Sequence, residues 1–213
     1  MGKILLFQGD SVTDAERTYG PKGVYHPGYL GEGYPKFIAE TLAKLEPDSI
    51  VKNRGVSGNR VRDLKARWED DCLRLKPEVL TVLIGINDTW RKYDSNDETP
   101  LEQFEADYDE ILTAAREKSV HQLFLMEPFV LPFPEDRAAW RVTLDPMIHA
   151  VRRLAKKHDA YLVPLDGMFA KTGVELGYDV VTLDGVHPTE EGHRMIAEAW
   201  LAAYAAANSG LGE

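Results

Sequence analysis

Short apolar runs alternate along this chain with longer segments in which apolar residues recur at helical spacing. The short runs are continuous and are flanked by Gly, Pro, Asn or Asp, at residues 3–8, 49–53, 79–84, 122–126 and 161–164. Strands that are buried on both faces of a parallel sheet have this pattern, because neither face needs polar residues. We therefore predict a central parallel sheet of about five strands.

The longer segments predict helices at residues 34–45, 61–75, 101–118, 138–158 and 189–207. Thr99 is a candidate cap for the third of these helices. The last begins with Thr189, Glu190 and Glu191, which places acidic side chains at the positive end of the helix dipole. Alternation of strands and helices predicts an α/β fold, a three-layer α/β/α sandwich. We expect one domain over residues 1–213, with residues 208–213 as a frayed tail.

The charge balance limits the partners that this chain can bind. The 213 residues include 35 acidic and 25 basic side chains, which gives a net charge of −10. An acidic surface repels phosphate backbones and anionic lipids, so we expect no nucleic acid and no membrane partner, and a neutral small molecule fits better. The first apolar run is too short for a signal peptide. Cys72 is the only cysteine, so we expect it to serve packing, in a cytoplasmic protein without disulfides.

Candidate chemistry lies where the predicted strands end, which is where open parallel sheets bind ligands. Ser11 follows the first strand within Gly9-Asp10-Ser11, and Gly58 lies in the glycine-rich turn after the second strand. Asn87 follows the third strand within Gly85-Ile86-Asn87-Asp88. Taken singly, these residues are also typical of helix caps and glycine turns.

Asp184 and His187 precede the last predicted helix, in a turn stiffened by Pro188. At this spacing the carboxylate can accept a hydrogen bond from one ring nitrogen, which leaves the other nitrogen free to take a proton from a hydroxyl. An Asx turn with a surface histidine has the same pattern. The joint occurrence of these segments, in this order and at strand ends, favours nucleophilic catalysis by Ser11.

The four segments resemble the sequence blocks of the GDSL/SGNH hydrolases over essentially the whole chain. This resemblance implies the flavodoxin-like SGNH hydrolase fold and a catalytic triad of Ser11, Asp184 and His187. It also implies an oxyanion hole formed by the Ser11 and Gly58 amides and the Asn87 side chain. We expect no cofactor and no metal.

Residues 55–69 and 84–94 are similar to the branch that contains bacterial acetylxylan esterases. That similarity implies an acetylated carbohydrate ester as substrate, deacetylation of xylo-oligosaccharides as activity, and a homo-oligomer as assembly. Relatives in this branch carry Trp before the catalytic Asp, whereas this chain has Leu183, so an aromatic wall of the sugar pocket is expected to be missing. Candidate substrate contacts are Asp10, Trp90, Arg91 and Tyr93, although Arg91 can instead pair with Asp94.

Three other classes of protein agree less well with the sequence. The sequence around Ser11 lacks the second glycine of the α/β-hydrolase nucleophile elbow, and no upstream segment can supply the usual oxyanion loop. A metal-dependent phosphoesterase could use Asp10, Asn87, Asp184 and His187, but the six histidines are scattered, and we expect His193 on a helix surface. A sugar-binding protein without catalysis is a third alternative.

A GDSL-type lipase, lysophospholipase or acyl-thioesterase is the alternative within the esterases. Such enzymes need a long apolar groove, and residues 128–134 are apolar but too rich in proline for a strand or helix. This segment could line a groove, although core packing or a subunit contact is the simpler interpretation.

Overall fold

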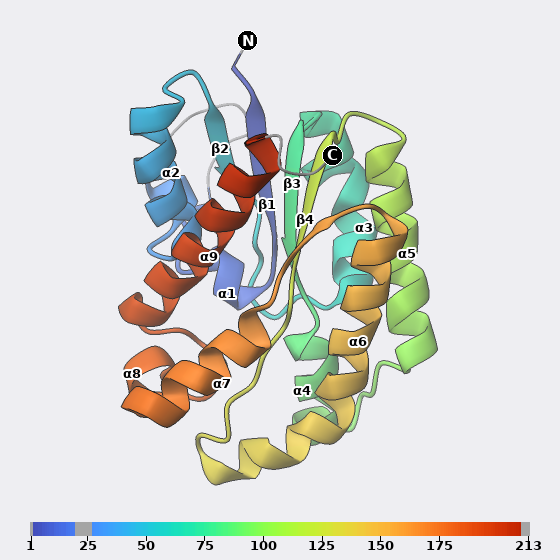
Figure 1. Cartoon of the computed structure of the whole chain (residues 1–213). Helices are drawn as coiled ribbons and strands as arrows, with labels where there is room; N and C mark the ends of the chain where they lie inside the picture. The colour runs from blue at the N-terminus through green and yellow to red at the C-terminus, as the bar shows by residue number, and fades with distance from the viewer. Residues whose placement is uncertain (1, 20–26, 210–213) are drawn as a thin grey trace.

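A parallel sheet forms the centre of the computed structural model, which describes residues 2–19 and 27–209. Its strands lie in the order β2-β1-β3-β4-β5, which is the order of flavodoxin-like sheets (Figure 1). The predicted α/β class and the five parallel strands are confirmed. The strands are β1 (Ile4–Gly9), β2 (Ile50–Asn53), β3 (Val79–Leu83), β4 (Gln122–Met126) and β5 (Tyr161–Val163).

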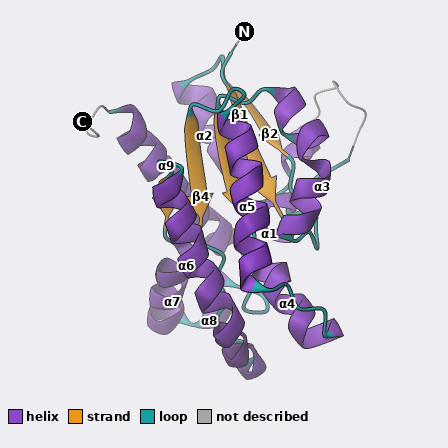
Figure 2. Ribbon diagram, turned by 90° about the vertical axis from the view of Figure 1, so that its right-hand side faces the viewer, coloured by secondary structure: helices purple, strands orange, loops and turns teal. Residues whose placement is uncertain are grey.

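Helices cover both faces of the sheet, because alternate strand side chains are apolar on both sides. Leu5 and Phe7 pack toward α2 (Tyr34–Leu45), α7 (Leu165–Leu176), α8 (Tyr178–Val181) and α9 (Glu190–Asn208). Leu6 and Leu80 pack toward α3 (Val61–Asp71), α5 (Leu101–Arg116) and α6 (Arg141–Lys157). Figure 2 shows α5 and α6 in front of the strands. The result is the expected three-layer sandwich.

Several elements differ from the predicted ones. The helix predicted over 61–75 ends at Asp71 and is followed by the 3-10 helix η2 (Leu73–Leu75), and α6 is preceded by η3 (Glu135–Trp140). The polar segment at residues 93–100 is not all loop, because α4 (Ile86–Ser95) extends into it. Thr99 caps no helix, since Pro100 is the N-cap of α5. The helices α1 (Ser11–Asp14), α4, α7 and α8 and the 3-10 helix η1 (Pro27–Leu30) were not predicted.

Two further expectations concern the C-terminus and the proline-rich segment. Of the expected tail, Asn208 is the last residue of α9, and residues 210–213 lie outside the described part of the chain. Phe129, Val130 and Leu131 are at most 3% exposed, and the Phe129 ring stacks on Phe169 at 3.9 Å. Residues 128–131 therefore contribute core contacts rather than an open acyl groove, whereas Pro132 and Pro134 are exposed. Cys72 is fully buried, in agreement with a packing role.

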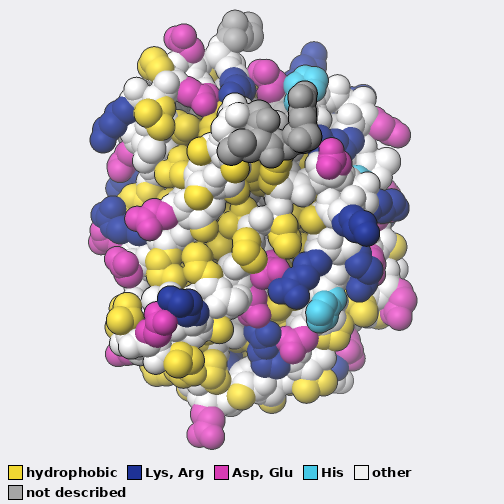
Figure 3. Space-filling view, in the orientation of Figure 1, with side chains coloured by type: hydrophobic (Ala, Val, Ile, Leu, Met, Phe, Trp, Pro, Cys, Tyr) yellow, Lys and Arg dark blue, Asp and Glu magenta, His cyan; other side chains and the backbone are white. Residues whose placement is uncertain are grey.

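The described surface is mixed in character despite the acidic charge balance. Apolar side chains gather over α7 and α8 (Figure 3), where Val174 and Leu176 are 74% and 63% exposed. Among the helices in the described ranges, none is both long and apolar enough to span a bilayer.

Candidate active site

Ser11 is the first residue of α1 and lies just beyond the carboxyl end of β1. The turn between strand and helix needs glycine, because a Cβ on Gly9 would lie only 2.2 Å from the Thr13 hydroxyl oxygen. Asp10 is the N-cap, and its Oδ1 accepts a hydrogen bond from the Val12 amide at 3.0 Å. The Ser11 amide is one of the first N–H groups of the helix, which have no acceptor within the helix.

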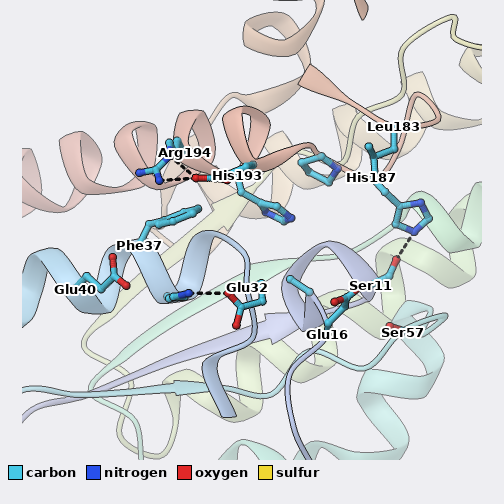
Figure 4. Close-up of a pocket in the computed structure, with 14 residues that line it drawn as sticks. Ser11, Glu16, Glu32, Phe37, Glu40, Ser57, Leu183, His187, His193 and Arg194 are labelled. Carbon is cyan, nitrogen blue, oxygen red and sulfur yellow. Dashed lines mark hydrogen bonds and ion pairs between the residues drawn. The ribbon is translucent and has the colours of Figure 1, made fainter. Parts of the chain in front are cut away.

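His187 reaches Ser11 from the turn that precedes α9. Its Nε2 lies 3.0 Å from the Ser11 Oγ, although 176 positions separate the two residues (Figure 4). An antiparallel bridge between Thr182 and Pro188 closes the turn, and the Leu183 amide donates to the His187 carbonyl at 2.8 Å. Gly185 has a φ of +84° and packs against backbone carbonyls, so only glycine fits at this point of the turn.

Asp184 holds the imidazole of His187 from the side opposite Ser11. Its Oδ2 accepts a hydrogen bond from His187 Nδ1 at 2.8 Å, while its Oδ1 accepts from the His187 and Val186 amides at 2.8 and 3.1 Å. Three donors on one carboxyl fix both its position and its ionised state.

The electrostatics of this pair suit a histidine that acts as a base. Burial opposes ionisation of Asp184, but the hydrogen bonds from His187 and Val186 outweigh it and lower the pKa to about 2. The hydrogen bond from Asp184 raises the pKa of His187, partly offset by burial, and the negative charges of Asp184 and Asp10 add to the rise. With Asp184 accepting from Nδ1–H, the neutral ring presents Nε2 as an acceptor to Ser11.

Backbone and side-chain hydrogen bonds join the loop after β2 to the end of β1 and to α1. The Val56 amide donates to the Gly9 carbonyl at 3.0 Å, and the Ser57 amide and hydroxyl donate to Asp14 Oδ2 at 3.0 and 2.7 Å. Gly58 follows with a φ of +82° and open space where a Cβ would stand. No acceptor for the Gly58 amide exists among the residues described, so this N–H is available to a ligand.

Asn87 lies next to this loop at the start of α4. Its side chain is 3% exposed, and its Nδ2 donates to the Asn59 carbonyl at 3.2 Å. The next residue, Asp88, accepts from the Val61 amide at 3.2 Å and so joins α4 to α3. The three predicted oxyanion donors therefore come from three strand ends that hydrogen bonds hold together. Such fixed N–H donors stabilise negative charge that develops on an ester oxygen.

Asp10 is too buried to contact a substrate. Its side chain is 1% exposed, and burial raises its pKa to about 7, against the lowering effects of the Val12 amide and His187. Asp10 therefore caps α1 from a buried position and is not the predicted substrate contact.

The other predicted substrate contacts belong to an aromatic cluster beside His187. The Trp90 ring lies 5.8 Å from the His187 ring and 5.0 Å from Trp140, and Tyr93 stacks on Trp140 at 5.5 Å. Tyr93 is 38% exposed. The Arg91 guanidinium pairs with Asp94, which is the second of the two arrangements expected for it.

Sequence reasoning missed some residues that shape the site. His193 is 9% exposed rather than on a helix surface, its Nδ1 accepts from the Tyr34 amide at 3.3 Å, and burial lowers its pKa to about 4. Arg137 from η3 covers the Trp140 ring at 4.1 Å. In the described ranges, no three His, Cys, Asp or Glu side chains form a group suited to a metal ion.

Comparison with known proteins agrees with this geometry. Residues 7–195 match the model of the GDSL-like lipase/acylhydrolase family. The acetylxylan esterase of Geobacillus stearothermophilus is 34% identical over 206 residues, which cover 94% of this chain and 93% of that protein.

Solved structures give the same relationship in three dimensions. The crystal structure of the Geobacillus stearothermophilus acetylxylan esterase superposes with a TM-score of 0.85 at 34% identity, covering 95% of this chain and 94% of that one. An enzyme from the metagenome of Lake Arreo, described as an alpha/beta hydrolase, gives a TM-score of 0.88 at 34% identity, covering 98% and 97%. The chain therefore belongs to the GDSL-like lipase/acylhydrolase family and is a carboxylic ester hydrolase.

Proposed function

We propose that this protein is a serine esterase that removes acetyl groups from xylo-oligosaccharides or related sugars through an acyl-enzyme intermediate. The observation that carries the proposal is the line of hydrogen bonds from Ser11 Oγ through His187 to Asp184. The similarity to acetylxylan esterases supports an acetylated sugar as the substrate.

In the first step, His187 Nε2 takes the proton of the Ser11 hydroxyl while Oγ attacks the ester carbonyl. The carbonyl oxygen becomes an oxyanion beside the Ser11 and Gly58 amides and the Asn87 side chain. The tetrahedral intermediate then collapses, the bond to the sugar oxygen breaks, and His187 returns its proton to the departing hydroxyl. Asp184 keeps the imidazole in the required tautomer throughout.

In the second step, water replaces the sugar. His187 removes a proton from this water as its oxygen attacks the acetyl carbonyl on Ser11, and the same donors hold the second oxyanion. Breakage of the bond to Ser11 Oγ releases acetate, and the proton on His187 restores the serine hydroxyl.

The packing supports a short acyl group. A long acyl chain needs a continuous apolar groove, and the segment with that composition, residues 128–134, has its central side chains at most 3% exposed.

Acetate release from acetylated xylo-oligosaccharides tests the proposal, together with a chain-length series of 4-nitrophenyl acetate, butyrate and octanoate. We expect the highest kcat/KM with acetate and no turnover above background by Ser11→Ala. A preference for octanoate would favour a lipase or thioesterase instead. Loss of activity with EDTA, restored by a divalent metal, would favour a metal-dependent phosphoesterase mechanism.

A further inference from the structure

A cavity of about 690 Å³ opens from Ser11 and His187 and extends between α2 and the start of α9 (Figure 4). We call it the α2/α9 groove. Its walls include Lys36, Phe37 and Glu40 from α2, and Glu190 and Arg194 from α9. A volume of this size accommodates a small-molecule ligand.

The position of the groove relative to the triad indicates which half of an ester it receives. His187, which must protonate the leaving oxygen, lines the groove, whereas Gly58 and Asn87 are not among the described residues that line it. The carbonyl oxygen of a bound ester faces the oxyanion donors, and the leaving oxygen faces the base. The alcohol half of the substrate therefore extends into the α2/α9 groove.

The described residues that line the groove carry an excess of negative charge. They include four carboxylates, from Glu16, Glu32, Glu40 and Glu190, and two cations, Lys36 and Arg194. Both cations are already paired, because Lys36 lies 2.6 Å from Glu32 and Arg194 lies 2.6 Å from Glu190. His193 adds no positive charge at neutral pH, since burial lowers its pKa to about 4.

Two of the carboxylates remain without a direct cationic partner. Among the residues described, no Lys, Arg or His nitrogen lies within 4.0 Å of the Glu16 or Glu40 carboxylate. Glu40 interacts at longer range with Lys36 and Arg194, whose charges Glu32 and Glu190 already offset. Figure 4 places Glu16 beside Ser11 and Glu40 toward the far end of the groove.

The backbone holds Glu16 in a left-handed conformation next to the nucleophile. Ala15 and Glu16 have φ values of 43° and 61°, which residues with a side chain seldom adopt in succession. The Glu32 amide donates to the Ala15 carbonyl at 2.7 Å, and Gly31 packs so closely that a Cβ there would lie 2.5 Å from the same oxygen. These contacts fix the local backbone and therefore the direction in which the Glu16 side chain points.

We infer that Glu16 and Glu40 make the α2/α9 groove select esters whose alcohol half is neutral or cationic over those whose alcohol half is anionic. This inference rests on the proposed esterase function. Applied to carbohydrates, it assigns neutral acetylated sugars and amino sugars as substrates and excludes sugars that carry a carboxylate, such as acetylated uronic acids. Two unpaired carboxylates within a Debye length of a charged alcohol change its binding several-fold at low salt.

Three acetyl esters test the inference: cationic acetylcholine, its uncharged isostere 3,3-dimethylbutyl acetate, and anionic 3-acetoxypropane-1-sulfonate. At about 10 mM ionic strength we expect kcat/KM for acetylcholine to exceed that for the isostere by about fivefold, with the sulfonate the slowest. At 0.5 M NaCl the difference between acetylcholine and its isostere should shrink to less than about twofold, because salt screens exposed charges.

Glutamine variants test whether Glu16 and Glu40 cause the preference for the cationic ester. The double variant Glu16→Gln/Glu40→Gln should lose most of the preference for acetylcholine over its isostere. The matched control Glu102→Gln/Glu117→Gln removes the same charge from α5 and its C-cap, across the sheet from the groove, and should keep the preference. This comparison also separates charge selection from binding of the ammonium group by aromatic rings, which neither salt nor the glutamine substitutions would abolish.

The outcomes distinguish this inference from the proposed function. Equal turnover of all three esters by the wild-type enzyme at low salt would overturn charge selection and leave the esterase function intact. A preference that persists in 0.5 M NaCl would overturn it as well, and this test does not depend on the folding of any variant. Absence of turnover with all three esters, the uncharged one included, would overturn the proposed function and the inference with it.

Discussion

Replacement of Asp184 by Asn tests the role of the carboxylate with little change in shape. In the wild-type site, Oδ1 accepts from two backbone amides and Oδ2 accepts from His187 Nδ1. The amide oxygen of Asn is expected to keep the two backbone bonds, which leaves its NH₂ group facing Nδ1. The ring must then carry its proton on Nε2, where it can no longer accept the Ser11 proton.

The structure sets the expected magnitudes. The wrong tautomer in a serine triad lowers kcat by ~10⁴, or about 5.4 kcal/mol at 1.36 kcal/mol for each tenfold change. The pKa of Asp184 is lowered from 3.8 to about 2, and its side chain is 33% exposed. Because its pKa is depressed, the charge stabilises the fold above about pH 4 and loses this effect as pH falls toward 2. After discounting for solvent screening, we expect the substitution to cost about 1–2 kcal/mol.

The assay is kcat/KM on 4-nitrophenyl acetate from pH 5 to 9, with urea unfolding measured in parallel. Asp179→Asn, the same chemical change at an exposed position on α8, is the control and should retain wild-type activity. A folded Asp184→Asn variant that keeps more than a tenth of the wild-type kcat/KM would refute the assignment of Asp184 as the residue that orients His187.

Three further predictions follow from the same geometry. Asn87→Ala should lower kcat by ~10²–10³ because it removes one oxyanion donor, and a loss under threefold in steady-state assays would contradict that role. The kcat/KM of the wild type should fall on acidification through a pKa above 6.5, because Asp184 raises the pKa of His187 and only the neutral ring accepts a proton; a flat profile between pH 5 and 8 would argue against it. Trp200→Phe should lower the free energy of unfolding by about 2–4 kcal/mol, measured by urea titration, since the fully buried indole donates to Thr81 Oγ1 at 2.8 Å.

The parallel sheet and most long helices could be predicted because their signals are local. The strands at the centre of the sheet are buried on both faces and are therefore continuously apolar. In α9, the apolar residues recur at helical spacing because they form its buried stripe. The helices α4 and α7 were missed for physical reasons. The first is strongly polar apart from Ile86, Trp90 and Tyr93, and the second contains Gly167 and Gly173, which lower helix propensity. Packing against the rest of the fold, rather than local sequence, makes these two segments helical.

The site residues that follow strand ends could be predicted from the sequence. Burial was harder to assess, although one signal was available for His193. That residue shares a stripe with Ile196, Ala197 and Trp200 at spacings of three, four and seven, so it lies on the buried face of α9. No comparable signal reveals the burial of Asp10, or the pairing of α2 with α9 that creates the groove, because these depend on contacts between distant segments.

Labelling with a fluorophosphonate probe, followed by peptide mass spectrometry, tests the central claim most directly, because the probe modifies only a serine that a neighbouring base activates. The proposed triad predicts one adduct, on Ser11, that forms in the wild type and is absent from Ser11→Ala and strongly reduced in His187→Ala. An unmodified Ser11, or equal labelling of Ser11 in His187→Ala, would contradict the claim.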